Sequence, residues 1–81
     1  MKIIIEDTSY EGSALDIIEK MKQDNINGEE YPDTVSFLES MREMFTRMTD
    51  IPCHLTGSTE ERARDMLAAL ESIDVVTVIE E

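Results

Sequence analysis

The chain has 81 residues, of which 19 are acidic and seven are basic, and its formal net charge is −12. A negative field of this strength repels nucleic acids and anionic lipid surfaces and attracts basic proteins. Hydrophobic residues make up 41% of the sequence and charged residues 32%, so we expect one folded domain over residues 1–81 rather than a disordered chain. So small a domain has little room for a large enclosed active site.

Cysteine content and hydropathy bear on the cellular compartment. Cys53 is the single cysteine, so the fold does not depend on an intramolecular disulfide or on an oxidising compartment. No apolar run in the sequence reaches the roughly 18 residues of a membrane helix. The three isoleucines after Lys2 are followed at once by acidic residues, which leaves too short an apolar run for a signal-peptide core. We therefore expect a cytoplasmic protein that does not bind membranes.

The first expected element is a strand over residues 2–6. Its three consecutive isoleucines suit a central strand that is buried on both faces. Thr8 and Glu11 fit a capping box at the start of a helix, and Ser13 is an alternative cap because Gly12 weakens the first turn. The apolar face predicted for this helix consists of Ala14, Leu15, Ile17, Ile18 and Met21.

The residues from Asp33 to Asp50 predict the helix around which the rest of the chain packs. A stop signal at 24–28 and a connecting loop at 29–32 precede this helix, and Asp33 or Thr34 supplies its cap. Its apolar residues follow a period of 3.6, and we expect them to be buried. They are Phe37, Leu38, Met41, Met44, Phe45 and Met48.

The same stripe has a second interpretation. The spacing of Leu38, Met41, Phe45 and Met48 fits a coiled-coil seam of two heptads, and methionine-rich faces adapt to varied partners. Burial in the core is the favoured interpretation, because without this stripe the domain would have little interior.

The last three expected elements are a strand, a helix and a strand. Residues 51–55 alternate in polarity, and Pro52 assigns this short strand to a sheet edge. Ser58 and Glu61 form a capping box for a helix that ends near residues 72–74. A final strand covers residues 75–79. The apolar stripe of the helix consists of Ala63, Met66, Leu67, Leu70 and Ile73.

These elements have the order βααβαβ and predict an α/β or α+β domain of two layers. We expect a three-stranded sheet with three helices mainly on one face. A strand, a helix and a strand in succession favour parallel pairing with a right-handed crossover, and the order of the strands stays open. Because the first and last strands are nearly uniformly apolar, the other face of the sheet could meet a second copy in a homodimer.

Parallel strands would bring two helix-start loops to one end of the sheet, where ligands bind in open α/β folds. Exposed helix amides there could hold a small anion. The alternative is that Thr8 and Ser58 act only as helix caps. In that case the protein's own carboxylates, on Glu11, Glu60 and Glu61, take the place of an anion at the helix starts. The candidate ligand-site residues are Thr8, Ser9, Tyr10, Gly57 and Thr59.

No motif in the sequence predicts catalysis, a metal site or a cofactor. Cys53 and His54 are adjacent, so on a strand they would point to opposite faces and could not act as nucleophile and base. We expect Cys53 to be a small core residue and His54 to lie on the surface. The acidic pairs lack the spacing of a calcium loop and are explained as solvated helix and chain ends.

Three segments of the sequence resemble proteins of one kind. The opening KIIIEDTSYEG, the middle FTRMTDIPC and the segment TEERARDMLAALESI are similar to small uncharacterised acidic proteins found on bacterial phages and mobile elements. The resemblance covers most of the chain and contains no mechanistic motif. It implies a bacterial, intracellular setting and a role in an element's dealings with its host.

Three functions are compatible with these features. The first is a non-catalytic protein-interaction or regulatory module with a basic protein partner. The second is an inhibitor that imitates the nucleic-acid backbone and occupies a basic DNA- or RNA-binding protein. The third is a small ligand-binding protein that uses the helix-start end of the sheet.

Overall fold

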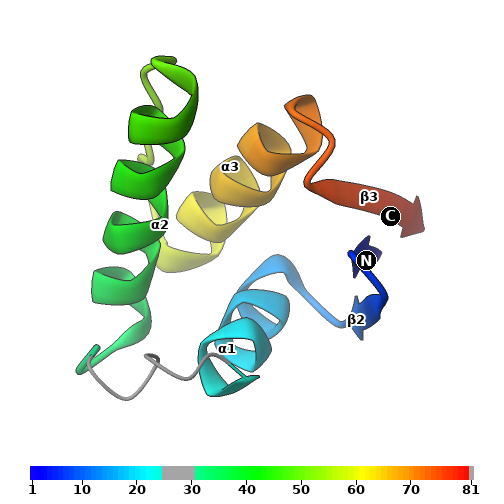
Figure 1. Ribbon diagram of the computed structural model, residues 1–81. Helices are drawn as coiled ribbons and strands as arrows, with labels where there is room; N and C mark the ends of the chain where they lie inside the picture. Colours follow the sequence, from blue (N-terminus) through cyan, green and yellow to red (C-terminus); the bar gives the residue numbers. More distant parts are fainter. Residues whose placement is uncertain (25–30, 81) are drawn as a thin grey trace.

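In this protein three helices lie on the same side of a three-stranded sheet (Figure 1). The structure, a computed structural model, describes residues 1–24 and 31–80. Most of the stop signal predicted at 24–28 and half of the loop predicted at 29–32 lie outside these residues. The elements in chain order are β1 (Lys2–Ile5), β2 (Thr8–Glu11), α1 (Ala14–Asp24), α2 (Thr34–Thr49), α3 (Thr59–Ser72) and β3 (Val76–Glu80).

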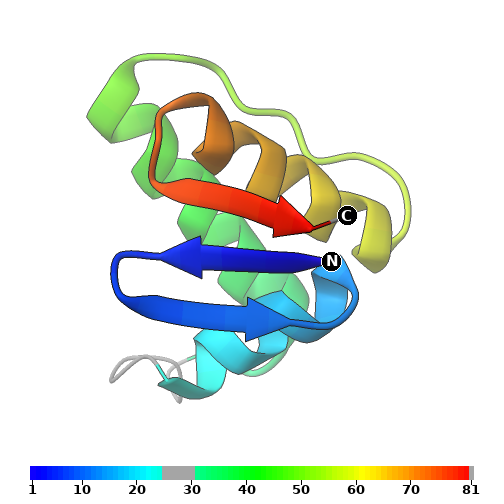
Figure 2. The ribbon, with the colours of Figure 1, turned by 90° about the vertical axis from the view of Figure 1, so that its right-hand side faces the viewer.

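The predicted three-stranded sheet with three helices on one side of it is confirmed, but the predicted order and parallel pairing are wrong. The observed order is ββαααβ, the strands lie in the order β2-β1-β3, and both pairings are antiparallel (Figure 2). The first strand does lie at the centre of the sheet. The physical reason for the change is a hairpin: β1 and β2 are joined by a two-residue turn, which costs less chain entropy than a crossover.

Residues 8–11 form β2 rather than the start of a helix. Ile3 pairs with Tyr10 and with Val78, while Ile4 lies between Ser9 and Thr77 on the face away from the helices. Ile3 is fully buried and Ile4 only half-buried. The outer face of the sheet is therefore of mixed polarity rather than uniformly apolar.

The strand predicted at residues 51–55 is wrong, because this segment forms no strand and connects α2 to α3 on the far side of α3 from β1 (Figure 2). The alternation, which puts Ile51, Cys53 and Leu55 on one face, matches the burial only in part: Cys53 is buried and Leu55 half-buried, but Ile51 is exposed. Burial in this segment comes from packing against helices. It has no neighbouring strand to complete a ladder.

α1 and α3 begin with the same local device, a glycine followed by a serine cap. The Ser58 side chain accepts a hydrogen bond from the Glu61 amide, and the Glu61 carboxylate accepts one from the Ser58 amide, which confirms the predicted capping box. Ser13 and Asp16 make the same two bonds at α1, so the alternative cap is the correct one. Each preceding glycine has a positive φ that other residues rarely adopt.

The core lies where α3 meets α1, α2 and the sheet. α3 packs against all three, whereas α2 packs against α1 and α3 and stands apart from the sheet (Figure 1). The buried core consists of Ile3, Ala14, Ile17, Ile18, Phe37, Leu38, Phe45, Cys53, Ala63, Met66, Leu67 and Val76. α3 is thus the central helix, rather than α2 as the sequence predicts.

Candidate functional site

The apolar stripe of α2 is divided into a buried side and an exposed side. Leu38 and Phe45 are buried. Met44 and Met48, which lie roughly a quarter turn away around the helix axis, expose 58% and 68% of their surface. Met41, between the two sides, is half-buried. The prediction that the whole stripe is buried is therefore wrong for two methionines, because α2 has helices beneath one side and, among residues 1–24 and 31–80, no covering element on the other.

These methionines line an open apolar groove, here called the methionine groove. It runs between α2 and the side formed by the sheet and the α3–β3 turn. Its upper part is lined only by apolar residues: Met41, Met44, Phe45, Met48, Leu70, Ile73 and Val75. The volume of this part is about 180 Å³.

The lower part of the methionine groove is larger and partly polar. Its volume is about 390 Å³, and it shares Met41, Met44, Leu70 and Val75 with the upper part, so the two form one continuous depression. The residues that only the lower part contains are Ile5, Tyr10, Met21, Asp24, Tyr31, Phe37 and Ser40.

Two tyrosines fix the polar end of the groove. The Tyr10 hydroxyl donates a hydrogen bond of 3.0 Å to the Asp24 carboxylate and so ties β2 to the end of α1. Partial burial, and then this bond to a carboxylate, raise the pKa of Tyr10 above its ordinary value. The Tyr31 hydroxyl lies 2.7 Å from the Ser40 hydroxyl, and its ring packs edge-on against Phe37 at 5.6 Å. These contacts bury Phe37 even though it lies on the same side of α2 as Met44.

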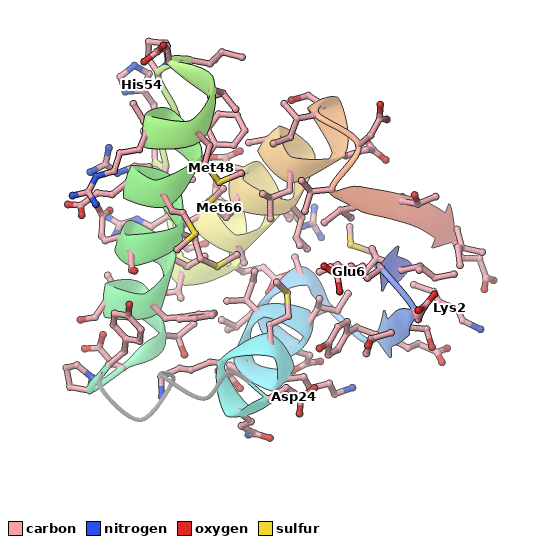
Figure 3. All side chains as sticks on the ribbon, in the orientation of Figure 1. Lys2, Glu6, Asp24, Met48, His54 and Met66 are labelled. Atoms are coloured by element: carbon pink, nitrogen blue, oxygen red, sulfur yellow. The ribbon has the colours of Figure 1, made fainter. Side chains whose placement is uncertain are left out.

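Carboxylates line the edge of the groove on the side of the sheet. Asp24 lines the groove itself, and the turns next to the lining residues Ile5 and Val75 carry Glu6, Asp7 and Asp74, all exposed. Figure 3 shows Glu6 and Asp24 on this side, across from Met48. Within the described residues, the two salt bridges involve Glu39 and Glu60 and leave this rim unneutralised. The groove therefore combines an apolar floor with a negative edge.

The five residues predicted as a ligand site are not brought together. Thr8 pairs with Ile5 at the end of the sheet where β3 begins, whereas Gly57 and Thr59 lie at the start of α3. The length of α3, about 20 Å, separates these ends. Ser9 is on the outer face of the sheet, and of the five only Tyr10 lines the methionine groove. The reason for grouping these residues was parallel pairing, which the structure contradicts.

Helix-start amides bind the protein's own carboxylates instead. Glu61 bonds the amide of Ser58 at 3.1 Å. Glu60 reaches from α3 to the amide of Leu15 in the first turn of α1, at 3.0 Å, and so links the starts of two helices. Hydrogen bonding to Ser58 lowers the pKa of Glu61 below its ordinary value. The self-capping alternative is confirmed for Glu60 and Glu61, but not for Thr8 and Glu11, which belong to β2.

Cys53 and His54 have the environments that the sequence predicts. Cys53 is buried, and His54, which Figure 3 labels, is exposed. Burial raises the pKa of the Cys53 thiol, although the nearby Arg42 charge acts in the opposite direction, so the nucleophilic thiolate is disfavoured. A shallow hollow next to this pair is lined mainly by residues of the connection and of α3.

A larger hollow of about 500 Å³ lies where the starts of α1 and β1 meet α3 and β3. Of its apolar lining residues, Ala14 and Leu67 are buried, Met1 and Val78 are half-buried, and the small Ala68 is exposed. Arg64 and Glu71 supply charge at its edge. Size alone would favour this hollow, but it lacks the large exposed apolar side chains that a binding surface presents. The methionine groove is therefore the better candidate site.

No known protein family, curated protein or solved structure matches this chain. The site must therefore be interpreted from its own chemistry. Among residues 1–24 and 31–80, none of the helices is long and apolar enough to cross a membrane. In the same residues, no three side chains of the metal-binding types come together.

Proposed function

We propose that this protein is a non-catalytic protein-interaction module and that the methionine groove is its binding surface. The observation that carries the proposal is the exposure of Met44 and Met48 beside Val75, which is itself 38% exposed. Single exposed apolar residues are ordinary. A group of them around one depression marks a surface that a partner covers. Methionine side chains are flexible and polarizable, so such a surface adapts to its partner.

A displayed peptide library panned against the folded protein tests this function. Peptides selected on the native protein should lose binding to Met44→Glu. They should retain binding to Ile79→Glu, which places the same charge at an exposed apolar position of β3 outside the groove. Peptides that bind both variants equally, or no enrichment at all, would contradict a groove-centred interaction module.

A second candidate function is binding of a small apolar ligand in the lower part of the groove. Its volume of about 390 Å³ falls within the range of roughly 300–1,000 Å³ found for small-molecule sites. The Tyr10–Asp24 and Tyr31–Ser40 pairs could orient such a ligand. Thermal stabilisation of the native protein by a small apolar compound, lost in Met44→Glu, would favour this candidate.

Imitation of nucleic acid is not favoured by any single face. Exposed carboxylates occur on all three helices and in the turns, whereas a phosphate mimic needs them aligned along one surface. The inhibitor hypothesis therefore stays a prediction. So do the cytoplasmic location, the bacterial setting and the link to mobile elements, which rest on sequence features alone.

A further inference from the structure

The chemistry of the groove wall selects the backbone conformation of its occupant. The upper part of the methionine groove presents side chains that are all apolar. An extended peptide seated there would bury amides and carbonyls without hydrogen-bond partners, at a cost for each group. A helix satisfies those groups internally and offers the wall only side chains. An α-helical occupant is therefore the best match.

The spacing of the wall gives the length of the contact. Met41, Met44 and Met48 follow one another by three and four residues along α2 and span about 10 Å of helix axis. This distance is two helical turns. A partner helix that lies along α2 would fill the groove with apolar side chains at positions i, i+3 or i+4, and i+7.

The edge of the groove selects the charge of the occupant. Glu6, Asp7, Asp24 and Asp74 lie on the side facing the sheet. On α2, the exposed Arg47 lies three residues after Met44 and directly before Met48. A net charge of −12 repels a second copy of this chain, which would bring the same carboxylates to the same edge. A cationic partner is attracted to the four carboxylates of this edge, which outnumber the positive charge of Arg47 on the opposite side.

We propose that the methionine groove binds an amphipathic α-helix of another protein, with apolar residues at i, i+3 or i+4, and i+7 and with lysine or arginine along its flanks. This inference rests on the proposed function and specifies the partner. A helix of about 18 residues is roughly 27 Å long, close to the 26 Å extent of the domain.

Three labelled synthetic peptides of about 18 residues test the proposal by fluorescence anisotropy. The first has a leucine stripe with lysine flanks, the second has the same stripe with glutamate flanks, and the third has the composition of the first in an order that destroys the stripe. We expect the native protein to bind the first peptide about tenfold or more tighter than either of the others. The glutamate peptide controls for apolar attraction, and the scrambled peptide controls for charge.

Two protein variants separate groove binding from general attraction between charges. Met44→Glu and Ile79→Glu each add one negative charge at an exposed apolar position, so a purely electrostatic association with the lysine peptide would tighten in both. We expect Met44→Glu to weaken binding about tenfold and Ile79→Glu to change it by less than about twofold. Thermal melts of both variants establish that each is folded.

Several outcomes would overturn the proposed partner. These are equal affinity for the lysine and scrambled peptides, equal behaviour of the two variants, or a concentration-dependent dimer of the native protein that Met44→Glu abolishes. If library panning instead returns extended or uncharged peptides that require Met44, the interaction function stands and the basic helix is wrong.

Discussion

α3 and α2 have similar apolar stripes in the sequence, but the two stripes are buried to different extents in the fold. α3 is covered by α1, α2 and β3, so Ala63, Met66 and Leu67 are buried. α2 lies on α1 and α3 alone, and the far side of its stripe faces solvent at Met44 and Met48. The period of a stripe indicates the direction in which a helix is apolar. The number of neighbours decides how much of that direction is covered.

The largest expected effect is a difference between two methionines that Figure 3 labels. Met66 in α3 is fully buried and Met48 in α2 is 68% exposed. Met66→Ala should lower the free energy of unfolding by about 2–5 kcal/mol, through lost transfer energy and a cavity. Met48→Ala should lower it by less than about 0.5 kcal/mol. Urea unfolding followed by circular dichroism measures both. Similar costs for the two would mean that the groove is closed in solution.

An intermediate effect is expected at the helix caps. Ser58→Ala should lower the free energy of unfolding by about 1 kcal/mol, because it leaves the Glu61 amide without its side-chain partner at the start of the central helix. Ser13→Ala should cost a similar amount at α1, where Asp16 makes the matching bonds. Ser9→Ala, an exposed change on the outer face of the sheet, serves as the control in the same unfolding experiment. Equal losses of unfolding free energy in the three variants would show that the cap hydrogen bonds do not stabilise the fold.

The smallest effect is a dependence of stability on pH that arises at the starts of α2 and α3. Asp33 accepts a hydrogen bond from the Ser36 amide, and hydrogen bonding to Ser36 lowers the Asp33 pKa, as bonding to Ser58 lowers that of Glu61. A carboxyl whose pKa is lower in the folded state stabilises the fold above its unfolded pKa, about 4. That contribution is lost as pH falls through the folded value.

Thermal melts between neutral pH and about pH 3 measure this dependence. The double variant Asp33→Asn/Glu61→Gln should show a shallower decline of Tm below about pH 4 than the native protein. A variant at two other exposed carboxylates for which no cap is present, Glu19→Gln/Glu43→Gln, controls for net charge. Parallel curves for all three proteins would rule out the caps as the origin.

The sequence predicted local features well and long-range pairing poorly. The caps at Asp33 and Ser58 and the central position of the first strand are confirmed. The β1–β2 hairpin was missed because its turn is Glu6-Asp7 rather than the usual Asn-Gly or Asp-Gly. Glu6 adopts a φ of 55, a conformation that non-glycine residues adopt at a cost. The Thr8–Tyr10 alternation and the stop at Gly12 were the signals that could have indicated a strand.

The candidate site was only partly visible in the sequence. The adaptable methionine face of α2 appeared as the less favoured interpretation of its stripe, whereas no pattern indicated that Tyr10, Tyr31 and Val75 would line the same groove. Those residues come from three separate segments. Their meeting depends on the antiparallel sheet and on the packing of α1 beneath the groove. Sequence spacing contains no direct information about such contacts.

By itself, the amino-acid sequence determined where helices begin, which sides of them are apolar, and that the surface is strongly negative. These properties depend on neighbours a few residues away and on total charge. Tertiary packing decided which strands pair, that α3 rather than α2 occupies the centre, and that Met44 and Met48 remain exposed. The physical reason is that coverage of an apolar face depends on elements distant in the chain, and the three helices and small sheet that the structure describes leave this side of α2 open.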